Sequence, residues 1–192
     1  MKKILYILST LIVISSCSKV HTPKPRGYFR IHFPEKEYVK YTENCPYSFE
    51  YPIYAKVYPY RGEQKEKYWI DVVFPQFNAE INISYKEVND TNLSILLDNS
   101  WTFLEKHNIK ADAVVDNWFY QEEKKVYGAI FEIKGNVASP MQFFLTDSVK
   151  HFFRGALYFL EVPNKDSLFP VIEFIKPDIY RLVESLEWKK ID

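Results

Sequence analysis

The sequence predicts an α+β fold, in which one antiparallel β-sheet is covered by two helices within a single domain. Hydrophobic residues make up 47% of the 192 residues and aromatic residues 18%, whereas glycine occurs only 5 times. Aromatic side chains pack well on pleated surfaces, so this composition favours sheet. Apolar residues recur at every second position over most of the chain and with helical spacing only near residues 93–104 and 169–188. Short polar turns between the predicted strands favour antiparallel pairing.

The first sixteen residues predict a secretory signal. Two lysines supply positive charge, the run Ile4–Ile14 is apolar except for Ser9 and Thr10, and small residues close the segment. This run is shorter than the roughly 20 residues that a permanent membrane-spanning helix needs. We therefore assign residues 1–16 to a signal peptide, with an uncleaved anchor as the alternative.

The end of this signal resembles a bacterial lipobox, carried by Ile14–Cys17. We expect cleavage between Ser16 and Cys17 and a diacylglyceryl group on the Cys17 sulfur. Each buried acyl methylene contributes roughly 0.8 kcal/mol, so two or three chains on one cysteine hold a protein durably at a membrane. Cleavage by the ordinary signal peptidase, without lipid, is the alternative.

A short tether is expected to join the lipid to the domain. Residues 17–27 hold Pro23 and Pro25 among polar side chains, which favours extended geometry. We place the α+β domain at residues 28–192. Its first segment predicts an extended chain with one face docked on the body, because apolar side chains take every second position: Phe29, Ile31 and Phe33.

Eight later segments have the alternation or the short apolar runs that are typical of strands. They are Tyr47–Tyr51, Ala55–Tyr58, Tyr68–Phe74, Ile81–Lys86, Ala113–Tyr120, Val126–Ile133, Met141–Leu145 and Val149–Leu160. Polar clusters at residues 122–125 and 134–136 predict hairpin turns. Polar residues alternate cleanly in Ile81–Lys86, so we expect one face of that strand to meet water.

Two segments predict helices. The first follows the capping residues at positions 90–92, ends near His107, and has one apolar stripe made of Leu93, Leu96, Leu97, Trp101 and Leu104. The second covers Phe169–Trp188, with Ile172, Ile175, Ile179, Leu182, Val183 and Leu186 on its apolar face. Pro177 should break or kink this helix, and Asp178 would then suit the first turn of a restarted one.

Composition and motifs argue against nucleic-acid binding, metal binding and catalysis. The 25 basic and 25 acidic residues balance, whereas nucleic-acid binding wants a basic surface. The four histidines form no ligand-spaced pair, no Cys-x-x-Cys occurs, and the glycines are scattered. We therefore assign no catalytic, cofactor-binding or metal-binding residue and expect no cofactor.

Two lone side chains need a decision between a structural and a reactive role. Once Cys17 carries lipid, Cys45 has no partner for an internal disulfide, and we interpret it as a buried inert thiol, with a reactive or intermolecular thiol as the alternative. We interpret His151, in an aromatic strand, as a satisfied sheet histidine, with a proton shuttle as the alternative.

The most unusual local stretch runs from Pro23 to Pro34, which is basic and aromatic. One interpretation is a docking segment, in which Arg26 and Arg30 contact carboxylates or phosphates and Tyr28 and Phe29 act as anchors. The other is an N-terminal strand that pairs with its own domain. The two interpretations do not exclude each other.

Four stretches together carry a family resemblance: Pro23–Tyr38, Cys45–Pro52, Asp166–Ile175 and Glu184–Trp188. With the lipobox, they resemble the gliding-motility lipoprotein GldD family of the Bacteroidota. The resemblance implies a cell-envelope lipoprotein needed for surface gliding that works beside the motor and the type IX adhesin-secretion machinery, with no known enzymatic activity and no cofactor. The order of elements also resembles the sandwich of the photosystem II protein PsbP and the nuclear import factor Mog1.

The function expected from sequence is therefore a non-enzymatic envelope component that binds proteins of the gliding and secretion machinery. A small-ligand or lipid-binding module is the alternative, with Trp118, Phe119 and Tyr120 lining a cleft, and a hydrolase of unrecognised type is a third. The residues after Cys17 lack an acidic run, which favours a domain that faces the periplasm. Inner and outer membrane both remain open.

Overall fold

A computed structural model describes residues 30–62, 66–108, 111–161 and 164–190, and its largest feature is a seven-stranded sheet. The strand order is β3-β4-β5-β9-β8-β7-β6, and all neighbours are antiparallel. The strands are β3 Lys56–Pro59, β4 Ile70–Phe74, β5 Ala79–Glu87, β6 Ala111–Gln121, β7 Val126–Gly135, β8 Met141–Thr146 and β9 His151–Phe159. The chain divides into Met1–Ile31 and His32–Asp192, and the second unit carries every strand and helix described.

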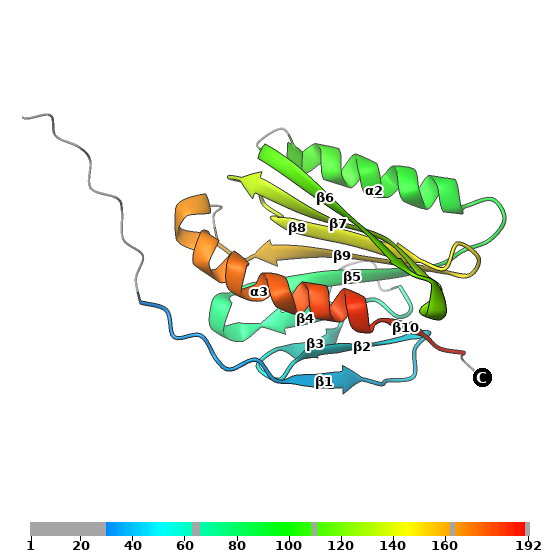
Figure 1. Ribbon diagram of the computed structural model, residues 1–192, viewed down its shortest axis with the longest axis horizontal. Coiled ribbons are helices and arrows are strands. Elements are labelled where there is room, and N and C mark those ends of the chain that lie inside the picture. Colours follow the sequence, from blue (N-terminus) through cyan, green and yellow to red (C-terminus); the bar gives the residue numbers. More distant parts are fainter. Residues whose placement is uncertain (1–29, 63–65, 109–110, 162–163, 191–192) are drawn as a thin grey trace, which may run out of the picture. The chain divides into compact units, whose positions relative to one another are not determined.

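A smaller sheet and two α-helices complete the domain (Figure 1). The small sheet has the order β1-β2-β10, with β1 at Tyr38–Tyr41, β2 at Tyr47–Pro52 and β10 at Glu187–Trp188. The helices are α2, Leu93–Asn108, and α3, Lys165–Ser185. The predicted α+β class with antiparallel strands and two helices is confirmed. In the described part of the chain, no helix is both long and apolar enough to span a membrane.

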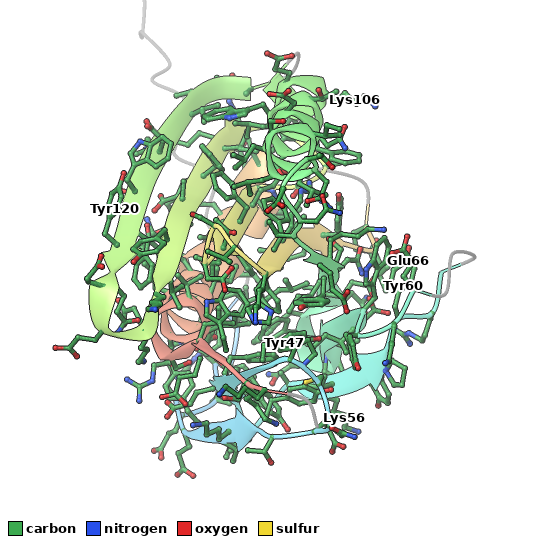
Figure 2. The ribbon with its side chains drawn as sticks, turned by 90° about the vertical axis from the view of Figure 1, so that its right-hand side faces the viewer. Tyr47, Lys56, Tyr60, Glu66, Lys106 and Tyr120 are labelled. Carbon is green, nitrogen blue, oxygen red and sulfur yellow. The ribbon has the colours of Figure 1, made fainter. Side chains whose placement is uncertain are left out.

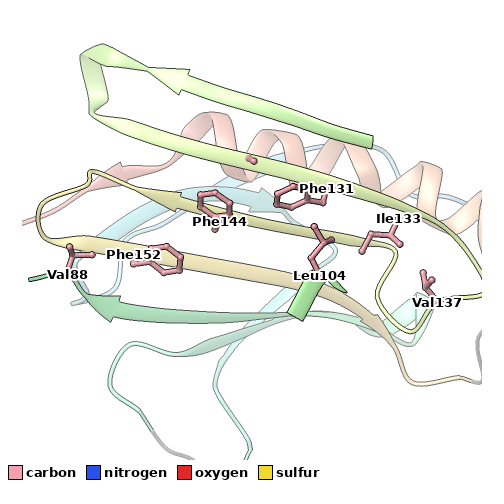
Figure 3. Close-up of a cluster of buried hydrophobic side chains, with 8 residues drawn as sticks. Val88, Leu104, Phe131, Ile133, Val137, Phe144 and Phe152 are labelled. Atoms are coloured by element: carbon pink, nitrogen blue, oxygen red, sulfur yellow. The ribbon is translucent and has the colours of Figure 1, made fainter. Parts of the chain in front are cut away.

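The two faces of the large sheet are covered by different elements. Successive residues of a strand point to opposite faces, so adjacent residues on β9 pack into hydrophobic clusters on opposite sides of the sheet. Phe152 packs in a cluster with Leu104 of α2 (Figure 3). Phe153 instead meets Tyr47 and Phe49 of β2, at ring-centroid distances of 4.8 and 6.2 Å. Helix α2 therefore covers one face, and the small sheet lies against the other.

Helix α2 follows the predicted pattern. Leu104 is buried, and three further leucines of the predicted stripe pack against the same cluster: Leu93, Leu96 and Leu97. Trp101 meets Phe131 of β7 edge to face, with ring centroids 5.2 Å apart. The prediction of this helix is confirmed; within its predicted apolar stripe Leu104 is buried, the other three leucines are partly buried and Trp101 is 39% exposed.

Helix α3 runs through Pro177 without interruption, so the predicted break is wrong. A proline inside a helix costs about 3 kcal/mol. On both sides of it, however, apolar side chains are buried on one face: Val171, Ile175, Ile179, Leu182 and Val183. Each such side chain contributes roughly 1.5–3 kcal/mol, so packing outweighs the lost hydrogen bond. The helix also ends earlier than predicted, at Ser185, because Glu187 and Trp188 pair with β2.

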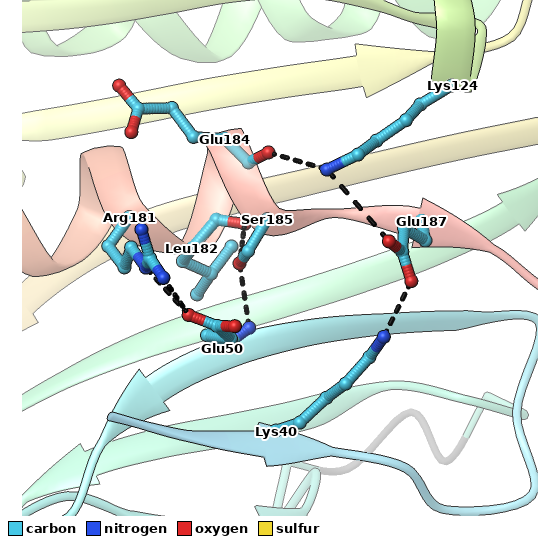
Figure 4. A network of polar contacts seen from close by, with 8 residues as sticks. All are labelled: Lys40, Glu50, Lys124, Arg181, Leu182, Glu184, Ser185 and Glu187. Carbon is cyan, nitrogen blue, oxygen red and sulfur yellow. Dashed lines mark hydrogen bonds and ion pairs between the residues drawn. The ribbon is translucent and has the colours of Figure 1, made fainter. Parts of the chain in front are cut away.

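Ion pairs and hydrogen bonds attach the small sheet to the end of α3 (Figure 4). The Arg181 guanidinium lies 2.6 Å from the Glu50 carboxylate, and the Glu50 backbone N–H donates to the Ser185 hydroxyl at 2.8 Å. The Lys40 ammonium donates to Glu187 at 2.6 Å, which lowers the pKa of that carboxyl group. The Arg181 and Ser185 contacts position β2 along the helix, and the Lys40–Glu187 pair joins β1 to β10 within the small sheet.

Candidate functional site

The outer side of strand β6 is the candidate functional site. This strand has 11 residues and is an edge strand of the seven-stranded sheet. It pairs with β7 along its length, from Gln121 opposite Val126 to Ala111 opposite Gly135. No other strand within the described ranges pairs with its outer side. Its backbone therefore presents unpaired donors and acceptors, which are a template for another extended chain.

The two edges of the large sheet differ in how well they are protected. Strand β3, at the other edge, has only four residues and includes Lys56 and Pro59, which both oppose strand addition. Strand β6 contains neither lysine nor proline. Its larger apolar side chains are instead exposed, Val114 by 37%, Val115 by 40%, Trp118 by 53% and Tyr120 by 74%. Figure 2 labels Lys56 and Tyr120 at the two edges.

Pairing with β7 determines which β6 side chains share a face. Val114 pairs with Ile133 and Trp118 with Ala129, both in the cluster under α2, so these two residues and Tyr120 lie on the α2 side. The Trp118 indole donates to the Asp116 carboxylate at 3.0 Å. This face therefore combines apolar rings with an acidic group.

Two contacts to α3 fix the position of β6. The Asn117 amide donates to the Tyr180 hydroxyl at 3.0 Å, and this hydroxyl donates to Glu132 of β7 at 2.8 Å. The Lys165 ammonium donates to Asp112 at 2.6 Å. Because these contacts hold the strand from the opposite face, the outer edge is presented in a preformed geometry.

The aromatic residues predicted to line a ligand cleft, Trp118, Phe119 and Tyr120, belong to this edge strand. They line neither of two clefts on the domain, a lysine-rich cleft beside Trp188 and a cleft beneath α2. Within the described structure these three residues belong to a strand at the edge of the sheet. Sequence reasoning missed the edge because alternation does not say which strand ends the sheet.

His151 lies in the lysine-rich cleft, which has a volume of about 640 Å³. Its Nδ1 is 2.7 Å from the Tyr85 hydroxyl oxygen, its Nε2 is 3.9 Å from Asp147, and its ring stacks on Trp188 at 4.8 Å. Burial lowers the pKa of His151, although Asp147 opposes the shift. The interpretation as a satisfied sheet histidine is confirmed.

Cys45 is buried, with 5% of its surface exposed. Its thiol donates to the Tyr47 carbonyl oxygen at 3.1 Å. Burial raises the pKa of this thiol, so the nucleophilic thiolate is disfavoured. The predicted burial of Cys45 is confirmed.

The predicted N-terminal site residues fall mostly outside the described part of the chain. Ser16, Cys17, Arg26, Tyr28 and Phe29 lie outside it, and Arg30 is exposed and belongs to no strand or helix. Residues 30–34, the part of Pro23–Pro34 that the structure describes, form no strand, so the interpretation as a strand is wrong there; β1 begins at Tyr38.

The segment from His32 to Tyr38 instead packs on α3 through side chains. The Phe33 ring stacks on Phe174 at 4.3 Å. The Lys36 ammonium donates to Asp178 and to the Phe174 carbonyl oxygen, each at 2.7 Å. Of the predicted apolar face, Phe33 thus contacts the body of the domain, and Lys36 adds a polar contact to the same helix.

Asp178 is the structural residue that sequence reasoning missed. It is 2% exposed and accepts hydrogen bonds from Lys36, from Tyr38 at 2.8 Å and from Tyr54. Burial and this carboxylate raise the pKa of both tyrosines. The assigned role in a restarted helix is wrong, and the available signal was an acid within the apolar stripe between Ile175 and Ile179.

Within the ranges that the structure describes, no three histidine, cysteine, aspartate or glutamate side chains lie close enough to hold a metal ion.

Of three comparisons with known proteins, the match to a family model agrees with the family resemblance of the sequence. A search of solved structures found the solution structure of cyanobacterial PsbP (CyanoP) from Synechocystis sp. PCC 6803, at 12% identity and a TM-score of 0.49, covering 92% of this chain and 99% of that one. The curated proteins gave no match. The family model described as "Gliding motility lipoprotein GldD" matches residues 18–188. The chain therefore belongs to the family of gliding motility lipoproteins GldD, which places it in the cell envelope, anchored to a membrane.

Proposed function

We propose that this lipoprotein is a non-enzymatic binding component of the gliding apparatus, and that its domain accepts an extended segment of a partner protein along the outer side of β6. The observation that carries the proposal is the unprotected 11-residue edge. Strand addition supplies main-chain hydrogen bonds, and side chains at alternate positions supply specificity.

The composition of β6 defines the chemistry of the partner segment. Beside its exposed apolar residues the strand carries no cation and two carboxylates, Asp116 and Asp112, of which Asp112 is already paired with Lys165. A complementary segment alternates apolar and basic residues. Opposite charges across paired strands stabilise the pair, and like charges destabilise it.

The anchor fits this role. In the proposal the signal is cleaved between Ser16 and Cys17, lipid is attached to Cys17, and the domain faces the periplasm. From Cys17 to Arg30 the chain spans at most about 45 Å at about 3.5 Å per residue. The domain therefore stays near its membrane, within reach of envelope proteins of the type IX machinery, and Arg26, Tyr28, Phe29 and Arg30 provide a second contact.

The sequence supports a role without catalysis because it contains no recognised catalytic motif. In this proposal the domain acts by holding a partner segment, and neither cofactor nor metal takes part.

Lysine substitutions on β6 test the proposal in gliding cells. Trp118→Lys and Tyr120→Lys place charges where a partner strand would bury them. We expect partner binding to weaken by roughly 1–3 kcal/mol, about ten- to hundredfold, and gliding to fall accordingly. The measurement is the gliding speed of single cells at matched protein amounts.

Matched controls are available at apolar positions away from β6. Ile53 is 52% exposed and Val149 65%, close to the 53% of Trp118 and the 74% of Tyr120. Ile53→Lys and Val149→Lys should leave gliding unchanged. If the β6 variants glide like these controls, β6 is not the docking edge.

A further inference from the structure

A second cleft lies beneath α2, on the face of the large sheet away from α3. It has a volume of about 380 Å³, within the roughly 300–1,000 Å³ of small-molecule sites. The sheet contributes Asn82, Ser84 and Arg154, and the helix contributes Asn99, Ser100 and Phe103. Aromatic rings at the opening include Tyr60, which is labelled in Figure 2, and Trp69. The lining thus joins polar groups on the sheet to flat apolar surfaces.

Arg154 is the charged group of this cleft that has no acidic partner. Its guanidinium donates to the Gln142 side-chain oxygen at 2.9 Å, forms a hydrogen bond with the Tyr158 side chain, and lies 4.5 Å from the centre of the Phe103 ring. Among the residues that the structure describes, no carboxylate lies within ion-pair distance of it. Charges that are partly withdrawn from water are normally paired, and the partial burial of Arg154 lowers the pKa of its guanidinium.

The acidic groups nearby already have other partners. Asp71 and Glu80 both contact Arg61 and both accept from the Asn82 amide, and Glu66 pairs with Lys86. These groups are therefore not available to balance the charge of Arg154.

The Gln142 side chain, beside Arg154, has a hydrogen-bond donor without an acceptor. Its side-chain nitrogen is buried and has no hydrogen-bond partner. Exchanging the amide oxygen and nitrogen would point the amide donors at the guanidinium, so the observed orientation is the one that Arg154 requires. The half-buried Arg154 thus lies beside a buried amide donor, and the Arg154 guanidinium, which lines the cleft, is the one of the two groups that can meet an acceptor there.

We propose that the cleft beneath α2 binds a small organic anion, a carboxylate joined to a flat apolar group. Its oxygens accept from Arg154, and the apolar group packs among Tyr60, Trp69 and Phe103. A carboxylate matches the planar donor array of a guanidinium, and the rings remove the flat group from water. This site is separate from the β6 edge and stands or falls independently of it.

Calorimetric titration of the full chain in phosphatidylcholine nanodiscs tests the site, with empty nanodiscs as the blank. Naphthalene-2-carboxylate is the probe, and naphthalene-2-carboxamide is its neutral counterpart. We expect the carboxylate to bind at least about tenfold more tightly, because only it forms a charge-assisted pair. Equal binding of the two compounds would overturn the proposal.

Two variants tie the binding to this cleft. Arg154→Met should abolish the preference for the carboxylate, whereas Arg181→Met, on the exposed side of α3, should keep it. Asn99→Trp fills the cleft from the helix and leaves Arg154 unsubstituted. It should weaken the binding of both compounds at least about tenfold. Ser94→Trp, an exposed control on the same helix, should not. Unchanged binding in Asn99→Trp would overturn the proposal even if Arg154→Met failed to fold.

Discussion

At the scale of single residues, the fold depends on a buried carboxylate that serves two distant segments. Asp178 on α3 accepts from Lys36 and Tyr38 near the start of the domain and from Tyr54 after β2. A buried charge contributes favourably only when it is paired and hydrogen-bonded. Three donors satisfy Asp178, so the segment that follows the tether is held on the last helix.

We expect Asp178→Ala to lower the free energy of unfolding by about 3 kcal/mol. The substitution leaves the Lys36 ammonium and two tyrosine hydroxyls without their acceptor, and breaking a buried pair costs about 3–5 kcal/mol. Urea unfolding of the full chain in detergent, followed by circular dichroism, measures the change. Asp98→Ala, an exposed acid on α2, should cost less than about 0.5 kcal/mol. Equal midpoints for the two variants would refute the role given to Asp178.

His151 makes stability depend on pH in a defined direction. Burial lowers its pKa below the ordinary 6.5, so the unfolded chain binds the proton at a higher pH than the folded chain. Its contribution is complete above about pH 6.5 and is lost as pH falls toward the folded pKa. Between pH 7.5 and 5.5 the free energy of unfolding should fall less steeply in His151→Gln than in the wild type. Parallel slopes would contradict this.

At the scale of elements, the apolar patterns predicted each helix, but tertiary packing set the boundaries. Helix α2 kept its predicted stripe because local spacing determines which side chains share a face. Helix α3 continued past Pro177 because buried residues on both sides outweigh one lost hydrogen bond. Its predicted last residues became β10 because β2, far away in sequence, offers them a strand partner.

Pro177→Ala should stabilise the protein by about 1–2 kcal/mol. Pro177 is exposed inside α3, and alanine restores the missing backbone donor, although it also frees the unfolded chain. Pro75 begins the short 3₁₀ helix Pro75–Phe77, where a proline costs little, so Pro75→Ala should give no gain. Thermal unfolding of the two variants compares them. A loss of stability in Pro177→Ala would show that the proline is favourable where it stands.

At the scale of the whole molecule, the features that depend on neighbouring residues in the sequence were predicted, whereas those that depend on contacts between distant segments were not. The α+β class and the family follow from alternation, helical stripes and short motifs, which are all local in sequence. The unprotected edge was not predictable, because it depends on pairings such as β5 with β9 that determine where the sheet ends. The role of Asp178 was also missed, since its donors lie about 140 residues away.

The central claim is strand addition at β6. Photo-cross-linking in living cells, with the cross-linked residues of the partner identified, tests it most directly. A photoreactive phenylalanine derivative is placed at Trp118 or at Tyr120, which share a face two residues apart, and at Tyr58 on β3 as the control. We predict cross-links from both β6 positions to one envelope protein, at residues two apart in one extended segment, and none to that segment from Tyr58. Cross-links scattered over unrelated segments, or equal capture from Tyr58, would contradict the account.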